Sequence, residues 1–260
     1  MTNERSFASL LESAVKEPGL ISSAYSQFHN YSLGNMILAW SQCKEREIPL
    51  GPIATFPRWK DLGRFVRKGE KALALCMPVT VKKQAETATD EPEVFTRFVY
   101  KNNWFVLAQT DGVDVPVVAP PSWDKSRALA ALDVTEIPFD CANGNVMGYA
   151  KGRSVTVSPV NPHPFKPLFH ECAHVLLGHT VEHEHADNDL TPRSLREVEA
   201  ESVALLVCDA LGLDGAEYSR GYIQSWIGAG ESIPEKSAQK IMKVADSILK
   251  AGRPAETEQN

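Results

Sequence analysis

The sequence lacks the features of a secreted or membrane-spanning protein. It has no apolar run of about 18 residues, the length that a transmembrane helix needs. Its first residues, Met1–Arg5, are followed at once by polar and acidic positions, so we predict no secretory signal and no membrane partner. Five cysteines are scattered without a CxxC pair or an even framework, which favours buried, reduced thiols. We therefore expect a cytoplasmic protein.

The sequence also lacks an excess of positive charge. Its formal net charge is −6, which by itself argues against a nucleic-acid-binding protein. The two halves differ, however, because residues 1–112 hold 14 Lys and Arg against 12 Asp and Glu, whereas residues 113–260 hold 13 against 21. This difference predicts two domains with different partners.

The chain has 260 residues and 43% hydrophobic content, enough for one large or two small domains with a buried core. The Val- and Pro-rich segment from Asp111 to Pro121 has the composition of an extended linker. We predict an α+β protein with an N-terminal α+β domain over 1–112, a linker over 113–123, a mostly helical domain with a small β-hairpin over 124–252, and a disordered tail over 253–260.

Hydrophobic periodicity and capping residues predict the secondary structure. In the first half, helical patterns precede two β-rich runs that flank an acidic, turn-like segment over 84–93. In the second half, one helix precedes a hairpin and further helices follow. The predicted helices cover 6–16, 20–30, 33–43, 55–63, 124–132, 164–178, 192–211, 216–227 and 234–251, and the predicted strands cover 72–81, 94–107, 145–150 and 154–157.

An HExxH motif stands in the second half, in the run His170-Glu171-Cys172-Ala173-His174. Positions four apart on a helix share one face, so His170 and His174 can bind one metal ion together. Glu171 flanks that face, where it can act as a general base toward a water molecule that the metal activates. Cys172 points away from both imidazoles, which favours a place in the core. The motif predicts metal-activated hydrolysis.

A catalytic zinc site needs a third protein ligand. A metzincin is excluded, because Leu177 and Thr180 stand where that class has Gly and His. A later helical segment carries Glu197, Glu199 and Glu201. Since Glu197 and Glu201 are four apart and share a face, we assign Glu197 to the metal and Glu201 to a hydrogen bond with a liganding histidine. Glu199 stays open as the rival ligand.

The segment between these two helices is rich in histidine and aspartate. It contains His179, His183, His185, Asp187 and Asp189. These side chains fit either a second metal site or a solvated loop at the rim of the cleft, and the composition favours the loop. For the HExxH site we predict Zn²⁺, with Mn²⁺ as the alternative.

A stretch in the first half, from Thr55 to Lys71, combines cations with aromatic rings. Positive groups for phosphates and rings for stacking suit single-stranded nucleic acid. The alternative is structural, with the rings in the core and the cations on a solvated face, and this stretch by itself favours that alternative. The candidate DNA-binding residues are Tyr31, Asn35, Arg58, Trp59, Lys60, Arg64, Arg67, Lys68 and Lys71.

In combination, these motifs resemble a known family. The run Thr55–Val79, with Asn30-Tyr31-Ser32 before it and Gln109-Thr110 after it, is similar to the N-terminal domain of ArdC-type antirestriction proteins. The HExxH run, the later Glu-x-x-Ala-Glu and Tyr222–Trp226 resemble the ArdC metallopeptidase domain, and residues 170–179 also resemble ImmA/IrrE peptidases. The resemblance implies a single-stranded-DNA-binding domain joined to a gluzincin-like zinc-peptidase domain. It also implies protection of incoming mobile-element DNA from restriction.

Three functions fit this resemblance. The first is a protein that binds single-stranded DNA and hydrolyses a protein substrate, such as a restriction component. The second is a DNA-coating decoy whose metal only stabilises the C-terminal domain. The third is a regulatory protease that cleaves a repressor. We predict the first, with Glu171 as the catalytic residue.

Overall fold

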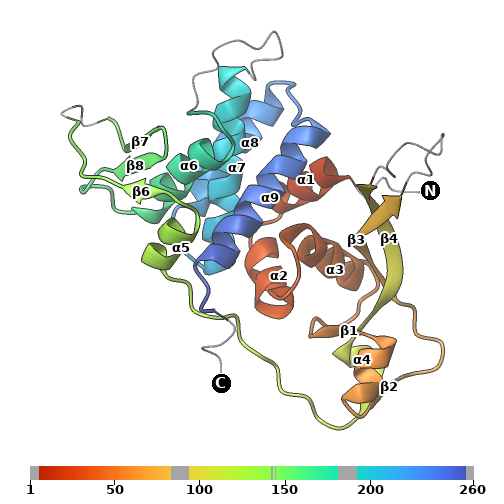
Figure 1. Cartoon of the computed structure of the whole chain (residues 1–260). Coiled ribbons are helices and arrows are strands. Elements are labelled where there is room, and N and C mark those ends of the chain that lie inside the picture. The colour runs from red at the N-terminus through yellow and green to blue at the C-terminus, as the bar shows by residue number, and fades with distance from the viewer. Residues whose placement is uncertain (1–5, 83–93, 142, 144, 181–191, 256–260) are drawn as a thin grey trace, which may run out of the picture. The chain divides into compact units, whose positions relative to one another are not determined.

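A computed structural model of the chain describes residues 6–82, 94–141, 143, 145–180 and 192–255 (Figure 1). The predicted acidic segment, most of the His-rich loop and the last five residues lie outside the described residues. The α+β class is confirmed, with a mixed α/β region, helices and a small sheet. None of the helices in the described segments is long and apolar enough to cross a membrane.

The chain forms two compact units. Residues 34–118 make the inserted unit, and residues 1–33 together with 119–260 make the helical unit. This division differs from the predicted one, because the first two helices pack with the C-terminal helices and not with the segment that follows them. An amphipathic helix must cover its apolar face, and neighbours in space need not be neighbours in sequence.

The inserted unit is built on a three-stranded antiparallel sheet of order β1-β4-β3. A second pair, β2 with β5, is also antiparallel. The short helix α4 has a proline in its first turn, where the missing N–H leaves no hydrogen bond unmade. The elements are α3 (Leu33–Glu45), β1 (Ile53–Thr55), α4 (Phe56–Asp61), β2 (Arg64–Val66), β3 (Leu73–Lys82), β4 (Val94–Val106), the 3-10 turn Leu107–Gln109, and β5 (Thr110–Gly112).

Helix α3 covers the outer edge of strand β3 with two side-chain amides. Asn35 donates to the carbonyl of Cys76 at 2.9 Å and accepts from its N–H at 2.8 Å. Gln42 makes the same pair of bonds to Ala74, each 2.9 Å long. Two amides thus replace a neighbouring strand and satisfy backbone groups that would otherwise stay unpaired at the sheet edge.

The helical unit is organised around α7, whose residues from Val198 to Cys208 are all buried. Helices α2, α6, α8 and α9 pack against it, and the small sheet of order β6-β8-β7 lies along α6 (Figure 1). Its elements are α1 (Phe7–Lys16), α2 (Leu20–Phe28), α5 (Lys125–Ala131), β6 (Thr135–Glu136), β7 (Gly148–Lys151), β8 (Ser154–Val157), α6 (Phe165–Leu176), α7 (Arg193–Leu211), α8 (Ala216–Gly228) and α9 (Glu235–Ala251).

Specific polar contacts tie the N-terminal segment into the helical unit. The carboxylate of Glu235 accepts the N–H groups of Phe7 and Ala8 at 3.0 and 2.9 Å, which caps the start of α1. At the other end of α1, Arg220 donates to the carbonyls of Ala14 and Val15, both at 2.7 Å. Both ends of α1 are therefore satisfied by C-terminal helices.

Candidate metal centre

The packing of α6 on α7 brings three predicted ligands together. The Nε2 atoms of His170 and His174 lie 3.0 Å apart. Glu197 Oε2 lies 3.5 Å from His170 Nε2 and 3.7 Å from His174 Nε2. The ligand atoms of these residues all lie within 4.8 Å of one another. One turn of α6 and one residue of α7 therefore present three donors to a common point.

These three residues fit a divalent metal ion. In a tetrahedral zinc site with bonds of about 2.0–2.1 Å, ligand atoms stand about 3.3 Å apart, close to the distances in this cluster. Burial lowers the pKa of His170, but the nearby Glu197 and Glu201 outweigh it and raise the pKa to about 9. Hydrogen bonds with His170 and His174 hold the pKa of Glu197 far below its usual range. Both shifts indicate a site that favours positive charge at its centre.

On the far side of His170, a carboxylate and an ammonium group complete the arrangement. Glu201 Oε1 lies 3.2 Å from His170 Nδ1, in the place predicted from its spacing to Glu197. Lys166 Nζ donates to the same oxygen at 2.6 Å. Burial raises the pKa of Glu201, but His170 and Lys166 outweigh that effect and hold it at about 2. Glu201 is thus a buried, charged neighbour of His170, one of the three candidate ligands.

On the far side of His174 lies His179, a residue that the composition assigned to a solvated loop but whose side chain is only 8% exposed. His179 Nδ1 lies 2.9 Å from His174 Nδ1, and His179 Nε2 lies 2.9 Å from Glu199 Oε2. Glu199, the rival ligand, is therefore paired with His179. Gly178, with φ of 80°, turns the chain back after α6 and brings His179 over the helix. A glycine followed by histidine after an HExxH helix is the sequence signal for this arrangement.

Glu171 is buried beside the ligands and next to an edge strand. Burial raises the pKa of its carboxyl, while the charges of His170 and His174 lower it. A Cβ added at Gly148, the first residue of β7, would lie 3.3 Å from Glu171 Cγ and 2.7 Å from the Thr156 carbonyl oxygen. The absence of a side chain at 148 therefore lets the strand pass directly against Glu171.

Two tyrosines of α8, Tyr218 and Tyr222, differ in their surroundings. Partial burial raises the pKa of Tyr222, and the charges of Glu197 and Glu201 add to it. Tyr218 instead packs its ring against His163, with ring centroids 5.9 Å apart. Of the two, Tyr222 is the one whose pKa the acidic residues of the centre raise.

Three of the predicted DNA-binding residues are buried and have internal partners. Asn35 holds the edge of β3, as described above. Trp59 is 1% exposed and donates its indole N–H to the Phe105 carbonyl at 2.9 Å. Arg64 donates to Thr110 through Nε at 2.7 Å and Nη2 at 2.8 Å, and further to the carbonyls of Gly112 and Val113. Burial removes these three side chains from direct contact with DNA.

The other predicted DNA-binding residues reach the surface to differing degrees. Tyr31 is half-buried, and Arg67 pairs with Glu70 at 2.8 Å and with Asp111 at 3.4 Å. Four cations are exposed and form no ion pair within the described segments. They are Arg58, Lys60, Lys68 and Lys71.

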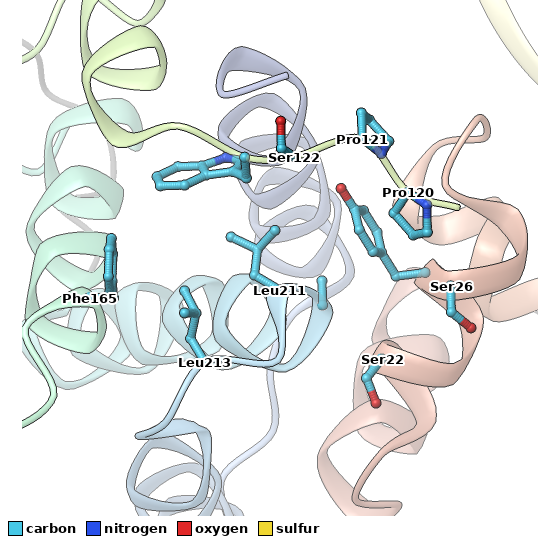
Figure 2. A pocket seen from close by; sticks show the side chains of 11 residues that line it. Ser22, Ser26, Pro120, Pro121, Ser122, Phe165, Leu211 and Leu213 are labelled. Atoms are coloured by element: carbon cyan, nitrogen blue, oxygen red, sulfur yellow. The ribbon is translucent and has the colours of Figure 1, made fainter. Parts of the chain in front are cut away.

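A separate cavity of about 390 Å³ lies within the helical unit (Figure 2). Figure 2 shows Pro120 and Pro121 near Ser26 of α2, with Phe165 of α6 across the cavity. Its lining holds no charged side chain and no member of the metal centre. The lining residues are Ser22, Tyr25, Ser26, Pro120, Pro121, Ser122, Trp123, Phe165, Ala210, Leu211 and Leu213.

Comparison with known proteins identifies the family of the N-terminal region. Residues 12–105 match the family model of the N-terminal domain of anti-restriction factor ArdC. The metal-free crystal structure of antirestriction ArdC from the R388 plasmid matches with a TM-score of 0.59 and 20% identity, over 95% of this chain and 97% of that one. Its Mn(II)-bound structure matches with a TM-score of 0.55 and 19% identity, over the same shares. The predicted resemblance is confirmed: residues 12–105 are an ArdC N-terminal domain, and nearly the whole chain has the ArdC fold.

A longer relative is also similar. An uncharacterized protein of Bacillus anthracis is 25% identical over 277 aligned positions, which cover 86% of this chain and 46% of the relative. The chain therefore spans about half the length of that protein.

Proposed function

We propose that this chain, with its ArdC fold, is a metal-dependent peptidase that acts together with a single-stranded-DNA-binding region in antirestriction. The observation that carries the proposal is the cluster of His170, His174 and Glu197, with the buried Glu171 beside it. A structural metal site has four protein ligands, whereas a catalytic site has three and keeps one position open. Three ligands and an adjacent carboxylate favour catalysis over a purely structural ion.

The chain's own residues supply the proton transfers of amide hydrolysis. When bound, a divalent ion at this centre supplies a Lewis acid that polarises a carbonyl and lowers the pKa of water. Glu171 takes a proton from the attacking water and delivers it to the leaving nitrogen as the C–O bond forms and the C–N bond breaks. We assign to Tyr222, whose pKa is raised in part by the charges of Glu197 and Glu201, the hydrogen bond to the carbonyl oxygen as it gains charge.

The edge of strand β7 is an argument for a polypeptide as the substrate. Because the Ser158 N–H donates to the Met147 carbonyl, the alternating pattern of an antiparallel pair turns the backbone groups of Gly148 and Ala150 away from β8. Among the described residues β7 is the last strand of its sheet, so these groups lie on an edge that pairs with no further strand there and that begins against Glu171. An extended peptide can add to such an edge through main-chain hydrogen bonds. We propose that the scissile segment binds there.

For DNA, we propose that exposed groups of the inserted unit make the contacts. The four exposed cations supply charge for phosphates, and the rings of Phe56 and Phe65, 53% and 62% exposed, supply stacking surfaces. The buried Trp59 and Arg64 hold the framework that presents them.

The deciding experiment compares wild type with Glu171→Gln on one preparation. Metal content, binding of an oligothymidine and cleavage of labelled casein are measured, together with protection of an unmodified plasmid in restriction-proficient cells. Glu171→Gln should retain metal and DNA binding but reduce cleavage by roughly 10²–10⁴-fold, because a general base is lost. The exposed Glu217→Gln serves as the matched control and should behave as wild type.

Other results would favour other functions. Protection that survives Glu171→Gln would contradict a role for cleavage and favour a DNA-coating decoy. Loss of a host repressor only in cells with the wild-type chain would favour a regulatory protease. Less than one equivalent of metal in the wild type would refute the metal centre.

A further inference from the structure

If His174 is a metal ligand, the contacts of His174, His179 and Glu199 allow a single arrangement of the ring protons. His170 and His174 both turn Nε2 toward Glu197, so Nε2 is the ligand atom of each. A histidine that ligates through Nε2 carries its proton on Nδ1. His174 must then donate from Nδ1 to His179 Nδ1 at 2.9 Å. His179 in turn carries its own proton on Nε2 and donates it to Glu199 Oε2 at 2.9 Å.

This chain of hydrogen bonds is buried and fixed at its far end. The side chain of His179 is 8% exposed and that of Glu199 is 2% exposed. Glu199 also interacts with Ser237 and Lys240. Ser237 and Lys240 belong to α9, so the far end of the chain is anchored on a helix outside the metal centre.

The turn after α6 holds His179 in this position. The His179 N–H donates to the His174 carbonyl at 2.8 Å, and the Gly178 N–H donates to the Val175 carbonyl at 3.2 Å. With Gly178 in the left-handed region, these bonds form the closing turn of a helix C-terminus. The imidazole is thus positioned by backbone geometry before any metal binds.

We propose that His179 and Glu199 are positioning residues that fix the ring and the tautomer of His174 for metal binding. This inference rests on the metal centre proposed above. On the Nδ1 side of His174 a neutral imidazole stands between the ligand and the carboxylate, whereas on the Nδ1 side of His170 the carboxylate of Glu201 lies next to the ring directly. The two ligands are therefore held by different partners, one ionic and one neutral.

The test separates hydrogen bonding from packing with two variants of one residue. His179→Asn keeps an oxygen near the position of Nδ1, which can still accept from His174, but loses ring volume. His179→Phe keeps the ring volume and loses the acceptor. Dissociation constants for Zn²⁺ and Mn²⁺ are measured on the full chain by competition with a chelator, and absorption spectra are recorded with Co²⁺ in the centre.

We expect His179→Phe to weaken metal binding by about 10- to 100-fold, the usual effect of removing a partner of a metal ligand. His179→Asn should bind metal more tightly than His179→Phe, and Glu199→Gln should lie between wild type and His179→Phe. The Co²⁺ bands should shift in His179→Phe because the His174 ring is free to turn. His29→Ala, which removes another buried imidazole, should leave affinity and spectrum unchanged.

Each contrary result has its own meaning. If wild type binds one equivalent of metal and His179→Phe binds it equally well, or better than His179→Asn, the positioning role is refuted. If wild type binds no metal, the proposed centre itself is refuted, and this inference falls with it. Melting temperatures of the metal-free variants show which of them keep the fold.

Discussion

The two compact units differ in the partners of their polar groups. In the inserted unit, the edge of β3 is closed by Asn35 and Gln42, and the buried Arg64 is surrounded by carbonyl and hydroxyl oxygens of its own framework. In the helical unit, no further strand pairs with β7 among the described residues, and part-buried histidines and a glutamate face one another around a shared point. Buried polar groups with fixed backbone partners stabilise a fold, whereas buried ionisable groups that face one another form a site.

The comparison shows where function lies in each unit. In the helical unit the functional candidates are buried or part-buried groups, because a metal centre needs ligands held away from competing water. In the inserted unit they are the exposed groups, because a nucleic acid can reach only the surface. Within the inserted unit, a buried arginine, asparagine or tryptophan therefore has a structural role, whereas an exposed cation or ring is a candidate DNA contact.

The largest expected effect tests the helical unit. His170→Ala removes one of three ligands, so metal affinity should fall by roughly three orders of magnitude, measured by chelator competition. DNA binding by the inserted unit should not change. Equal metal content in His170→Ala and wild type would contradict the assignment of the centre.

The next effect tests whether buried polar groups of the inserted unit are structural. Arg64→Leu should destabilise the fold by about 2–4 kcal/mol, because several buried oxygens lose their donor. Denaturant unfolding followed by tryptophan fluorescence measures this change. Lys68→Leu, at an exposed site nearby, should change stability by less than about 0.5 kcal/mol. An Arg64→Leu chain with unchanged stability but weaker DNA binding would make Arg64 a DNA contact after all.

A smaller effect tests whether the substrate binds at the edge of β7. Ala150→Pro removes an N–H that faces away from β8, so the β7–β8 ladder stays intact while one main-chain bond to substrate is lost. Cleavage of labelled casein should fall by about 10-fold, the equivalent of one such bond. Ala150→Ser keeps the N–H and should cleave at close to the wild-type rate. Equal rates for both variants would remove the edge strand from substrate binding.

The smallest effect concerns the exposed cations. If all four touch phosphates, the logarithm of the affinity for oligothymidine should fall with the logarithm of salt concentration with a slope near −3. Replacing Lys60 and Lys68 by Gln should reduce that slope by about 1.4. If the doubly substituted chain has the same slope as wild type, these lysines do not contact the DNA. A preference for duplex would contradict single-strand binding.

Much of the secondary structure followed from local pattern. The structure places α3 at Leu33–Glu45 and α9 at Glu235–Ala251, close to the predicted bounds of 33–43 and 234–251. The strands β1, β2, β5 and β6 were not predicted, because two or three residues are too short to show an alternating pattern. Such strands are defined by their partners, and pairing between distant segments is not encoded in a local window.

Part of the candidate centre could also be predicted from local spacing, and part could not. Helical spacing sufficed for His170 and His174, and the spacing on the later helix singled out Glu197 and Glu201. It could not find His179 and Glu199 as a pair, because the reversal at Gly178 breaks the helical periodicity on which that reasoning depends. It also could not separate Arg64 from Lys60, since burial depends on what packs above a residue.

The sequence by itself determined the helices, the two long strands, the shared face of the two HExxH histidines and the likeness to ArdC, because each depends on residue identity at short spacing. Only the tertiary structure decided that Glu199 pairs with His179, which polar groups are buried with internal partners, and which edge of each described sheet has no neighbouring strand. Those outcomes depend on contacts between segments far apart in the chain, such as α6 with α7 and α3 with β3. Local patterns constrain such contacts weakly, and packing selects among them.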